Sequence, residues 1–243
     1  MLYKAYQLLF VLPIGLLVTF LASVLGSLAC MLFGERVGSY WPGRLWSAII
    51  VRLLLLPVSV EGRENLQPGQ SYVFVANHQG PFDIFLIYGF LRRPFKWVMK
   101  KSLRKIPFVG YFCEKAGFIF VDKTSRITVK QTMQDASAKL QDGASIVIFP
   151  EGARSFTGHM GQFRRGGFLL AEHAGLPICP LTIDGSFDVL RRQDGFNFVN
   201  WHRLRLVIHK PVNYGPTTLE DTYRTIMSAL PEKYQGYVEN PDQ

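Results

Sequence analysis

The first sixty residues restrict the fold most, because they contain one long segment without a charge. From Ala5 to Phe33 every side chain is uncharged and most are apolar. A helix of this length would extend about 43 Å, whereas the hydrocarbon core of a bilayer is about 30 Å thick. Pro13 and Gly15 lie inside the segment, so it can form a tilted span or a broken, re-entrant hairpin. A secretory signal has an apolar core of only about 7 to 15 residues, so we expect a retained anchor.

A second apolar stretch, Trp41 to Val60, contains only two charged residues, Arg44 and Arg52. This composition predicts an amphipathic helix that lies on or partly in one leaflet. Trp41 and Trp46 suit the membrane–water interface, where an indole buries its body and keeps its N–H in water. The alternative is that Leu53 to Leu56 packs on the globular domain, and both readings can hold for different faces.

The charge of the chain limits its partners. A net charge of +9 and a pI near 9.6 fit an anionic membrane surface, a phosphorylated substrate or nucleic acid. Lysine and arginine are dispersed and no nucleic-acid-binding motif is present, so we expect no nucleic-acid partner. Arg36, Arg44 and Arg52 follow the uncharged segment, whereas Lys4 precedes it. This bias predicts that the C-terminal part lies on the cytoplasmic face of a membrane, which in a bacterium is the inner membrane.

The cysteines and histidines predict no metal site. Cys30, Cys113 and Cys179 are too few and too scattered for a disulfide or metal framework. The histidines beyond residue 150 have no metal-ligand spacing with Cys, Asp or Glu.

From residue 71 onward, short β-rich runs alternate with helical patterns, which is typical of an α/β domain. We expect a mainly parallel central sheet flanked by helices and preceded by an N-terminal membrane-embedded helical element. The predicted domains are residues 1–60, the membrane-anchoring helices, and residues 61–243, the α/β domain. The predicted strands are 72–76, 97–99, 117–121, 146–149, 178–183 and 205–208. The predicted helices are 83–91, 127–141, 166–174 and 218–230, with helix caps at Gly143 and Gly175.

Two polar runs follow predicted strands, so both lie at the edge of the sheet where α/β proteins bind ligands. The first run extends from Asn77 to Asp83. Gly80-Pro81 is a turn signal that can return Asp83 to His78. In such a pair the carboxylate fixes the imidazole tautomer, and the free ring nitrogen takes a proton from a hydroxyl. The alternative is a histidine that makes only structural hydrogen bonds.

The second run, Phe149 to Ser155, has the composition of an anion site. Arg154 offers a planar fork that suits phosphate oxygens, and Gly152 lets backbone N–H groups approach closely. For Glu151 three roles are open: holding Arg154, binding an acceptor hydroxyl, or bracing the loop.

Together these runs resemble the glycerolipid acyltransferase family, specifically the 1-acylglycerol-3-phosphate acyltransferases. The resemblance covers roughly residues 60 to 210 and includes four blocks in order. The blocks are Asn77–Asp83, with the His-x4-Asp signature, Gly117–Lys123, Phe149–Ser155, with the Phe-Pro-Glu-Gly-x-Arg-Ser signature, and Leu176–Leu181. Lys123 stands where the family usually has arginine, and Gly80 where it often has serine.

The resemblance implies transfer of an acyl group from acyl-CoA or acyl carrier protein to the sn-2 hydroxyl of lysophosphatidic acid, giving phosphatidic acid. His78 and Asp83 would be the catalytic pair, and Arg154, Gly152, Lys100 and Lys123 would bind phosphate. Asn77, Glu151 and Ser155 would support the acceptor or the loops. The resemblance also implies an N-terminal two-helix element that docks on the membrane. No organic cofactor is required.

Two alternatives stay open. One is an O-acyltransferase of the same family that acts on glycerol-3-phosphate, a lyso-ornithine lipid or another lysophospholipid. The other is a basic peripheral protein that binds anionic lipid without catalysis. The His78–Asp83 pair argues against the second alternative, because lipid binding alone needs no base.

Overall fold

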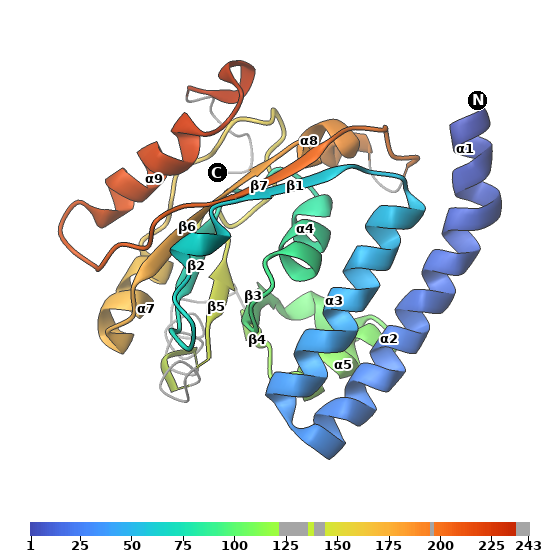
Figure 1. Ribbon diagram of the computed structural model, residues 1–243, viewed down its shortest axis with the longest axis horizontal. Helices are drawn as coiled ribbons and strands as arrows, with labels where there is room; N and C mark the ends of the chain where they lie inside the picture. The colour runs from blue at the N-terminus through green and yellow to red at the C-terminus, as the bar shows by residue number, and fades with distance from the viewer. Residues whose placement is uncertain (122–135, 139–143, 195–196, 237–243) are drawn as a thin grey trace.

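A computed structural model describes residues 1–121, 136–138, 144–194 and 197–236. Its centre is a seven-stranded sheet with the strand order β1-β7-β6-β2-β5-β3-β4 (Figure 1). The strands are β1 (Val58–Glu61), β2 (Val73–Ala76), β3 (Lys96–Lys100), β4 (Ile119–Val121), β5 (Ile146–Ile148), β6 (Ile178–Asp184) and β7 (Leu204–Ile208). Neighbouring strands are parallel except β6 and β7, which are antiparallel. The prediction of a mainly parallel sheet flanked by helices is therefore confirmed.

Helices cover both faces of the sheet, as Figure 1 shows. The helices of the α/β part are α4 (Phe82–Phe90), α5 (Val109–Lys115), α7 (Gly166–Ala174), α8 (Ser186–Val189) and α9 (Thr218–Ser228). Short 3₁₀ turns are η2 (Arg63–Asn65), η3 (Lys101–Lys105), η4 (Arg192–Asp194) and η5 (Glu232–Tyr234). The predicted helix 127–141 lies almost entirely outside the described residues, and so does Gly143. Gly175 ends α7 in the left-handed conformation, as expected for a helix cap.

Strand β2 lies at the centre of the core, because its side chains alternate between the two faces. Phe74 and Ala76 belong to one buried cluster with residues of α4, α5 and α3 (Glu35–Leu53). Val73 and Val75 belong to a second cluster with residues of α7 and α9. All four side chains are buried, as expected for an interior strand of a parallel sheet.

The N-terminal segment forms one continuous helix from Leu2 to Phe33, the one helix among the described residues that is long and apolar enough to cross a membrane. It consists of α1 (Leu2–Tyr6), a π-helical turn η1 (Gln7–Val11) and α2 (Leu12–Phe33). The π turn ends two residues before Pro13, where it accommodates the missing N–H and the ring of the proline. The chain reverses at Gly34, which has φ +82°, and not at Pro13 or Gly15.

Helix α3 (Glu35–Leu53) runs back along α2 and packs on α4 (Figure 1). The predicted single helix through Val60 was wrong at its end. Leu55 has a positive φ and Pro57 follows it, so the helix ends at Leu53 and β1 pairs with β7. The Trp46 N–H faces α2 and not water, because its Nε1 donates to Thr19 Oγ1 at 2.9 Å between α2 and α3. Trp41 is exposed.

Candidate functional site

The two polar runs leave neighbouring strands at the same edge of the sheet. Asn77 and His78 follow β2, the run from Phe149 follows β5, and the two strands are parallel. Two hydrogen bonds join the runs, because His78 N donates to the side-chain Oε1 of Glu151 at 2.7 Å and Ser155 N donates to the backbone O of His78 at 2.8 Å. Residues more than 70 positions apart in sequence thus form one site at the carboxyl edge of the sheet.

His78 and Asp83 form the pair that the turn signal predicts. Pro81 caps α4 and places Asp83 in its first turn, where His78 Nδ1 lies 2.7 Å from Asp83 Oδ2. Asp83 is fully buried, and its Oδ2 also accepts from Gly80 N at 3.0 Å. An ionised carboxylate only accepts, so Nδ1 carries the proton and Nε2 is the basic nitrogen. Gly80 has no space for a side chain, because an added Cβ would lie 2.9 Å from Ser186.

The His78 ring is held by stacking as well as by Asp83. Its centroid lies 4.0 Å from that of Phe149 with an interplanar angle of 14°, and Phe149 in turn stacks on Trp97 at 6.0 Å. The His78 side chain is 16% exposed, and its Nε2 makes no hydrogen bond to any residue that the structure describes. The free nitrogen of an oriented imidazole can therefore receive a proton from a bound hydroxyl.

Glu151 connects the site to the following loop. Its side chain is buried, Oε1 accepts from His78 N, and Oε2 accepts from Gly161 N at 2.8 Å. Burial raises the pKa of the Glu151 carboxyl to about 8, although the two N–H donors act in the opposite direction. Of the three roles open for this residue, the hydrogen bonds fit bracing of the loop.

Asn77 and Ser155 are buried and bond to backbone groups. Asn77 Nδ2 donates to Ile183 O at 2.8 Å, and Ile183 N donates to Asn77 Oδ1 at 2.7 Å, which ties the end of β2 to β6. Ser155 Oγ accepts from Thr157 N at 3.1 Å and from Gly158 N at 2.8 Å. These bonds fit the predicted support of the loops.

Arg154 is half-buried beside Gly152, whose φ of +78° allows the sharp turn after Pro150. The Arg154 guanidinium makes no hydrogen bond to the described residues, so its fork is open to a ligand. The Arg154 carbonyl accepts from Arg192 Nη1 at 2.9 Å. The Arg192 guanidinium also lies over the ring of Phe156, 3.9 Å from its centroid. Sequence reasoning missed Arg192, because it belongs to η4 and no local motif relates it to the 149–155 run.

Of the two predicted phosphate-binding lysines, Lys100 is among the described residues. Lys100 is exposed at the end of β3, next to β5, and thus shares the carboxyl edge with the two runs. No contact joins it to His78 or Arg154. Lys123 lies outside the described residues.

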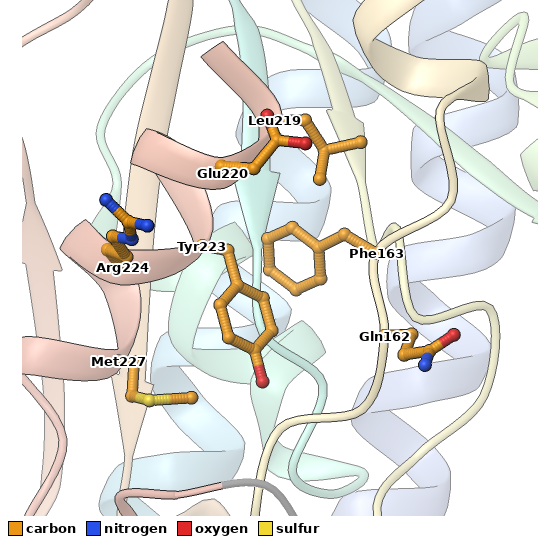
Figure 2. A pocket seen from close by; sticks show the side chains of 7 residues that line it. All are labelled: Gln162, Phe163, Leu219, Glu220, Tyr223, Arg224 and Met227. Atoms are coloured by element: carbon orange, nitrogen blue, oxygen red, sulfur yellow. The ribbon is translucent and has the colours of Figure 1, made fainter. Parts of the chain in front are cut away.

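An open groove lies apart from this edge, between α9 and the loop that contains Phe163 (Figure 2). It contains none of the predicted site residues. Its lining consists of Gln162, Phe163, Leu219, Glu220, Tyr223, Arg224 and Met227. Among the described residues, no group of three or more His, Cys, Asp and Glu side chains could hold a metal ion. The His78–Asp83 pair therefore marks the candidate site better than the groove does.

Comparison with known proteins identifies the family. The sequence profile described as "Acyltransferase" matches residues 57–184, which include both polar runs. The chain belongs to the acyltransferase family. The resemblance inferred from the four blocks is thereby confirmed.

Individual acyltransferases agree with this assignment. The chain is 31% identical over 206 residues to a 1-acyl-sn-glycerol-3-phosphate acyltransferase of Chlamydomonas reinhardtii, covering 83% of this chain and 61% of that protein. It is 37% identical over 124 residues to the 1-acyl-sn-glycerol-3-phosphate acyltransferase of Pseudomonas aeruginosa, covering 51% of this chain and 48% of that protein. The chain thus spans about half to three fifths of the length of these curated relatives.

The acyltransferase fold is also found in a solved structure. The crystal structure of the 1-acyl-sn-glycerophosphate (LPA) acyltransferase PlsC from Thermotoga maritima matches with a TM-score of 0.71 and 27% sequence identity. The match covers 89% of this chain and 91% of that chain.

Proposed function

We propose that the protein transfers an acyl group from an acyl thioester to the sn-2 hydroxyl of 1-acylglycerol-3-phosphate, giving phosphatidic acid. The observation that carries the proposal is the His78–Asp83 pair, joined at 2.7 Å at the sheet edge that also bears Arg154. The relatives reported above are 1-acyl-sn-glycerol-3-phosphate acyltransferases, which supports the choice of acceptor. The donor is acyl-CoA or acyl carrier protein.

The proposed reaction is a direct transfer. His78 Nε2 takes the proton of the acceptor hydroxyl while the hydroxyl oxygen attacks the thioester carbonyl carbon. The C–S bond then breaks, and the leaving thiolate takes the proton back from the imidazolium. Asp83 keeps the ring in the tautomer that makes Nε2 basic. General-base catalysis of this kind contributes typically about 10²- to 10⁴-fold.

We assign phosphate binding to Arg154 with the backbone at Gly152, aided by Lys100 and Lys123. The Arg154 fork matches two phosphate oxygens, whereas lysine supplies a point charge. Glu151, Asn77 and Ser155 hold the loops that carry these groups. The reaction needs no metal and no organic cofactor.

We also propose that the helices before β1 dock the protein on a membrane at its cytoplasmic face. The outward side of α2 exposes a row of large apolar side chains, which would otherwise be in water. Its other side packs along α3, which carries Arg36, Arg44 and Arg52, so a perpendicular span would draw these cations into hydrocarbon. The packing therefore favours α2 lying along one leaflet. Because β1 begins at Val58, we place the end of the anchoring element before it.

Acyl transfer by the purified protein in lipid vesicles tests the proposal. Labelled acyl-CoA and acyl carrier protein would be supplied with lysophosphatidic acid, glycerol-3-phosphate, a lyso-ornithine lipid or a lysophospholipid in parallel. We expect labelled phosphatidic acid from lysophosphatidic acid with the highest kcat/KM. A higher kcat/KM for another acceptor would replace the proposed substrate.

The same assay tests the histidine pair. His78→Ala should retain less than about one tenth of the activity while binding lysophosphatidic acid within several-fold of wild type, because a base acts mainly on the transition state. Asp83→Asn should also lower kcat, because the imidazole loses its orientation. If wild type and both variants bound vesicles equally and none transferred an acyl group, the protein would be a lipid-binding protein without this activity.

A further inference from the structure

We propose that residues 101–111, which contain η3 and the start of α5, form a second membrane contact beside α2 and dock on the anionic headgroups of a bilayer. We call these residues the docking segment. The inference rests on the proposed membrane role of the N-terminal helices. It adds a separate surface from within the α/β part of the chain.

The docking segment exposes several large apolar side chains. The exposed fractions are 37% for Leu103, 44% for Ile106, 56% for Phe108 and 52% for Tyr111. Four such residues within nine positions form a cluster, whereas single exposed apolar residues are normal on a soluble surface. The cluster therefore needs an apolar or interfacial partner.

Phe108 joins this cluster to the exposed side of α2. Its ring meets that of Phe20 edge to face, with centroids 4.9 Å apart. Phe20 is itself exposed, so the apolar surface of α2 continues onto the docking segment without interruption. A further contact fixes the two elements, because an added Cβ on Gly26 of α2 would overlap Phe112 of α5. A membrane that contacts α2 at Phe20 is thus adjacent to Phe108.

The backbone at Phe108 is strained in a way that sets the position of its ring. Its φ is +61°, a conformation that bulky residues rarely adopt. Such strain persists where the surroundings impose it, and it is common at binding sites. Here the strained residue starts α5 and presents its own side chain at the surface instead of burying it.

The charges around the cluster select an anionic lipid surface over a protein partner. Between residues 100 and 115 the chain has five cations and one carboxylate, Glu114. Arg104 pairs with Glu114, and Lys115 lies over the ring of Tyr111 at 5.4 Å. Lysine is depleted in protein–protein interfaces, whereas lysine with aromatic residues is typical of membrane surfaces. Each cation near an anionic leaflet strengthens binding about fivefold.

The position of the docking segment relates this contact to the candidate site. The segment directly follows β3, and β3 pairs with β5, which leads into the Glu151–Arg154 loop. Docking would hold this carboxyl edge of the sheet at the depth of lipid headgroups. A lysophospholipid acceptor could then reach the site without leaving the membrane surface.

Contact with lipid chains can be measured at single positions of the full-length protein. A fluorophore would be attached to Tyr111→Cys, to Leu28→Cys on α2, or to Val212→Cys, which pairs with Ile178 at the start of β6. Cys30, Cys113 and Cys179 are buried, which limits background labelling. The protein would be bound to vesicles of phosphatidylcholine and phosphatidylglycerol, with or without brominated acyl chains. We expect quenching at positions 28 and 111 and none at 212. Quenching at position 28 but not at position 111 would overturn the proposed docking of residues 101–111. The proposed membrane role of the N-terminal helices would then still stand.

Paired substitutions test the energetics. Ile106→Ser/Phe108→Asn should lower the vesicle partition coefficient several-fold, and asparagine tolerates the positive φ. Leu169→Ser/Val212→Ser removes two exposed apolar residues elsewhere and should change the partition coefficient less than about twofold.

Lys105→Gln should weaken binding to phosphatidylglycerol-containing vesicles about fivefold. Lys210→Gln should leave this binding unchanged. With vesicles of phosphatidylcholine alone, neither Lys105→Gln nor Lys210→Gln should change binding. Equal effects of each test and control variant would overturn the inference, with circular dichroism used to check that all variants are folded. These experiments measure membrane binding and not acyl transfer. Their outcome therefore does not depend on whether the proposed reaction occurs.

Discussion

At the scale of residues, His78 is fixed by four independent contacts. Its N–H donates to Glu151, its carbonyl accepts from Ser155, its ring bonds Asp83, and the ring stacks on Phe149. Three of these partners belong to the second polar run. The position of the base therefore depends on the loop that also carries Arg154, and a change in that loop should affect both groups.

Arg192 should act on substrate binding through that loop. Arg192→Ala removes the bond to the Arg154 carbonyl and the stacking on Phe156. We expect KM for lysophosphatidic acid to rise about tenfold, with a smaller change in kcat, because a charge-assisted hydrogen bond is worth about 1.5 to 3 kcal/mol. Arg192→Lys should recover little, because it lacks the planar group. Steady-state kinetics with Arg191→Ala, whose guanidinium lies over Phe187, serves as the control. A KM for Arg192→Ala equal to that of the control would contradict this role.

Glu151 should make stability depend on pH. The folded pKa of about 8 lies above the ordinary value of 4.5, so the folded state binds more protons between these values. The contribution of Glu151 to the free energy of unfolding is thus complete below about pH 4.5 and is lost as the pH rises towards 8. We expect the melting temperature of wild type to fall from pH 5 to pH 8 more steeply than that of Glu151→Gln. The free energy of unfolding should fall over this pH range by a few kcal/mol more in wild type than in Glu151→Gln, on the order of 1.4 kcal/mol per pKa unit. Parallel curves for the two proteins would show that Glu151 is ionised in the folded state.

At the scale of elements, glycines allow the N-terminal helices to approach one another and α4 closely. An added Cβ on Gly38 of α3 would overlap the backbone of α2 at Cys30, and one on Gly43 would overlap the ring of Tyr88 in α4. Both glycines have helical backbone, so their role is close packing and not an unusual φ. These contacts make α3 a packed layer of the α/β part.

Gly43→Ala should therefore destabilise the protein although alanine favours helices. Overpacking of a buried contact costs about 1 to 3 kcal/mol, which exceeds the gain of about 1 kcal/mol in helix propensity. Gly15→Ala is the matched control, because its Cβ would lie 3.4 Å from Ile50, an ordinary contact. We expect a lower melting temperature for the first variant and an unchanged or higher one for the second. A stabilised Gly43→Ala protein would mean that α3 and α4 can separate at little cost.

At the scale of the whole molecule, the anchoring helices cover one flank of the α/β part along their length. Tyr3 and Tyr6 donate to the carbonyls of Leu54 and Leu53, and Gln7 exchanges two hydrogen bonds with the backbone of Val199. The beginning of the long helix is thus attached to the rest of the chain, and its middle is attached through Thr19, which accepts from Trp46 of α3. Such a helix cannot cross a bilayer independently of the polar part.

This arrangement predicts one depth for all lipid-facing positions of α2. Leu17, Leu21 and Leu28 are exposed and lie on one side of the helix. Spin labels at these three positions should show equal depth by power-saturation measurements with oxygen and a nickel chelate. A perpendicular helix would instead separate the first and last labels by about 16 Å. A gradient of that size would establish a span and would require α3 to detach from α2.

Local patterns along the chain were enough for much of this fold. The helix 166–174 agrees with the prediction at both ends, because its apolar period stops at Gly175, a residue suited to the left-handed cap. The His78–Asp83 pair also follows from a short turn and the start of a helix. In both cases the interacting groups are near neighbours in sequence, so their spacing restricts their geometry.

Other features depend on partners that no local pattern records. Residues 58–61 form a strand because β7 supplies the hydrogen bonds, from more than a hundred positions away. Trp46 is held between α2 and α3 by Thr19, although an indole side chain suits a membrane interface equally well. Arg192 reaches the Arg154 loop only after β6 has paired with β2. Packing and hydrogen bonding between distant segments decide such positions, because each residue could satisfy its own chemistry in several places until the folded chain leaves one of them.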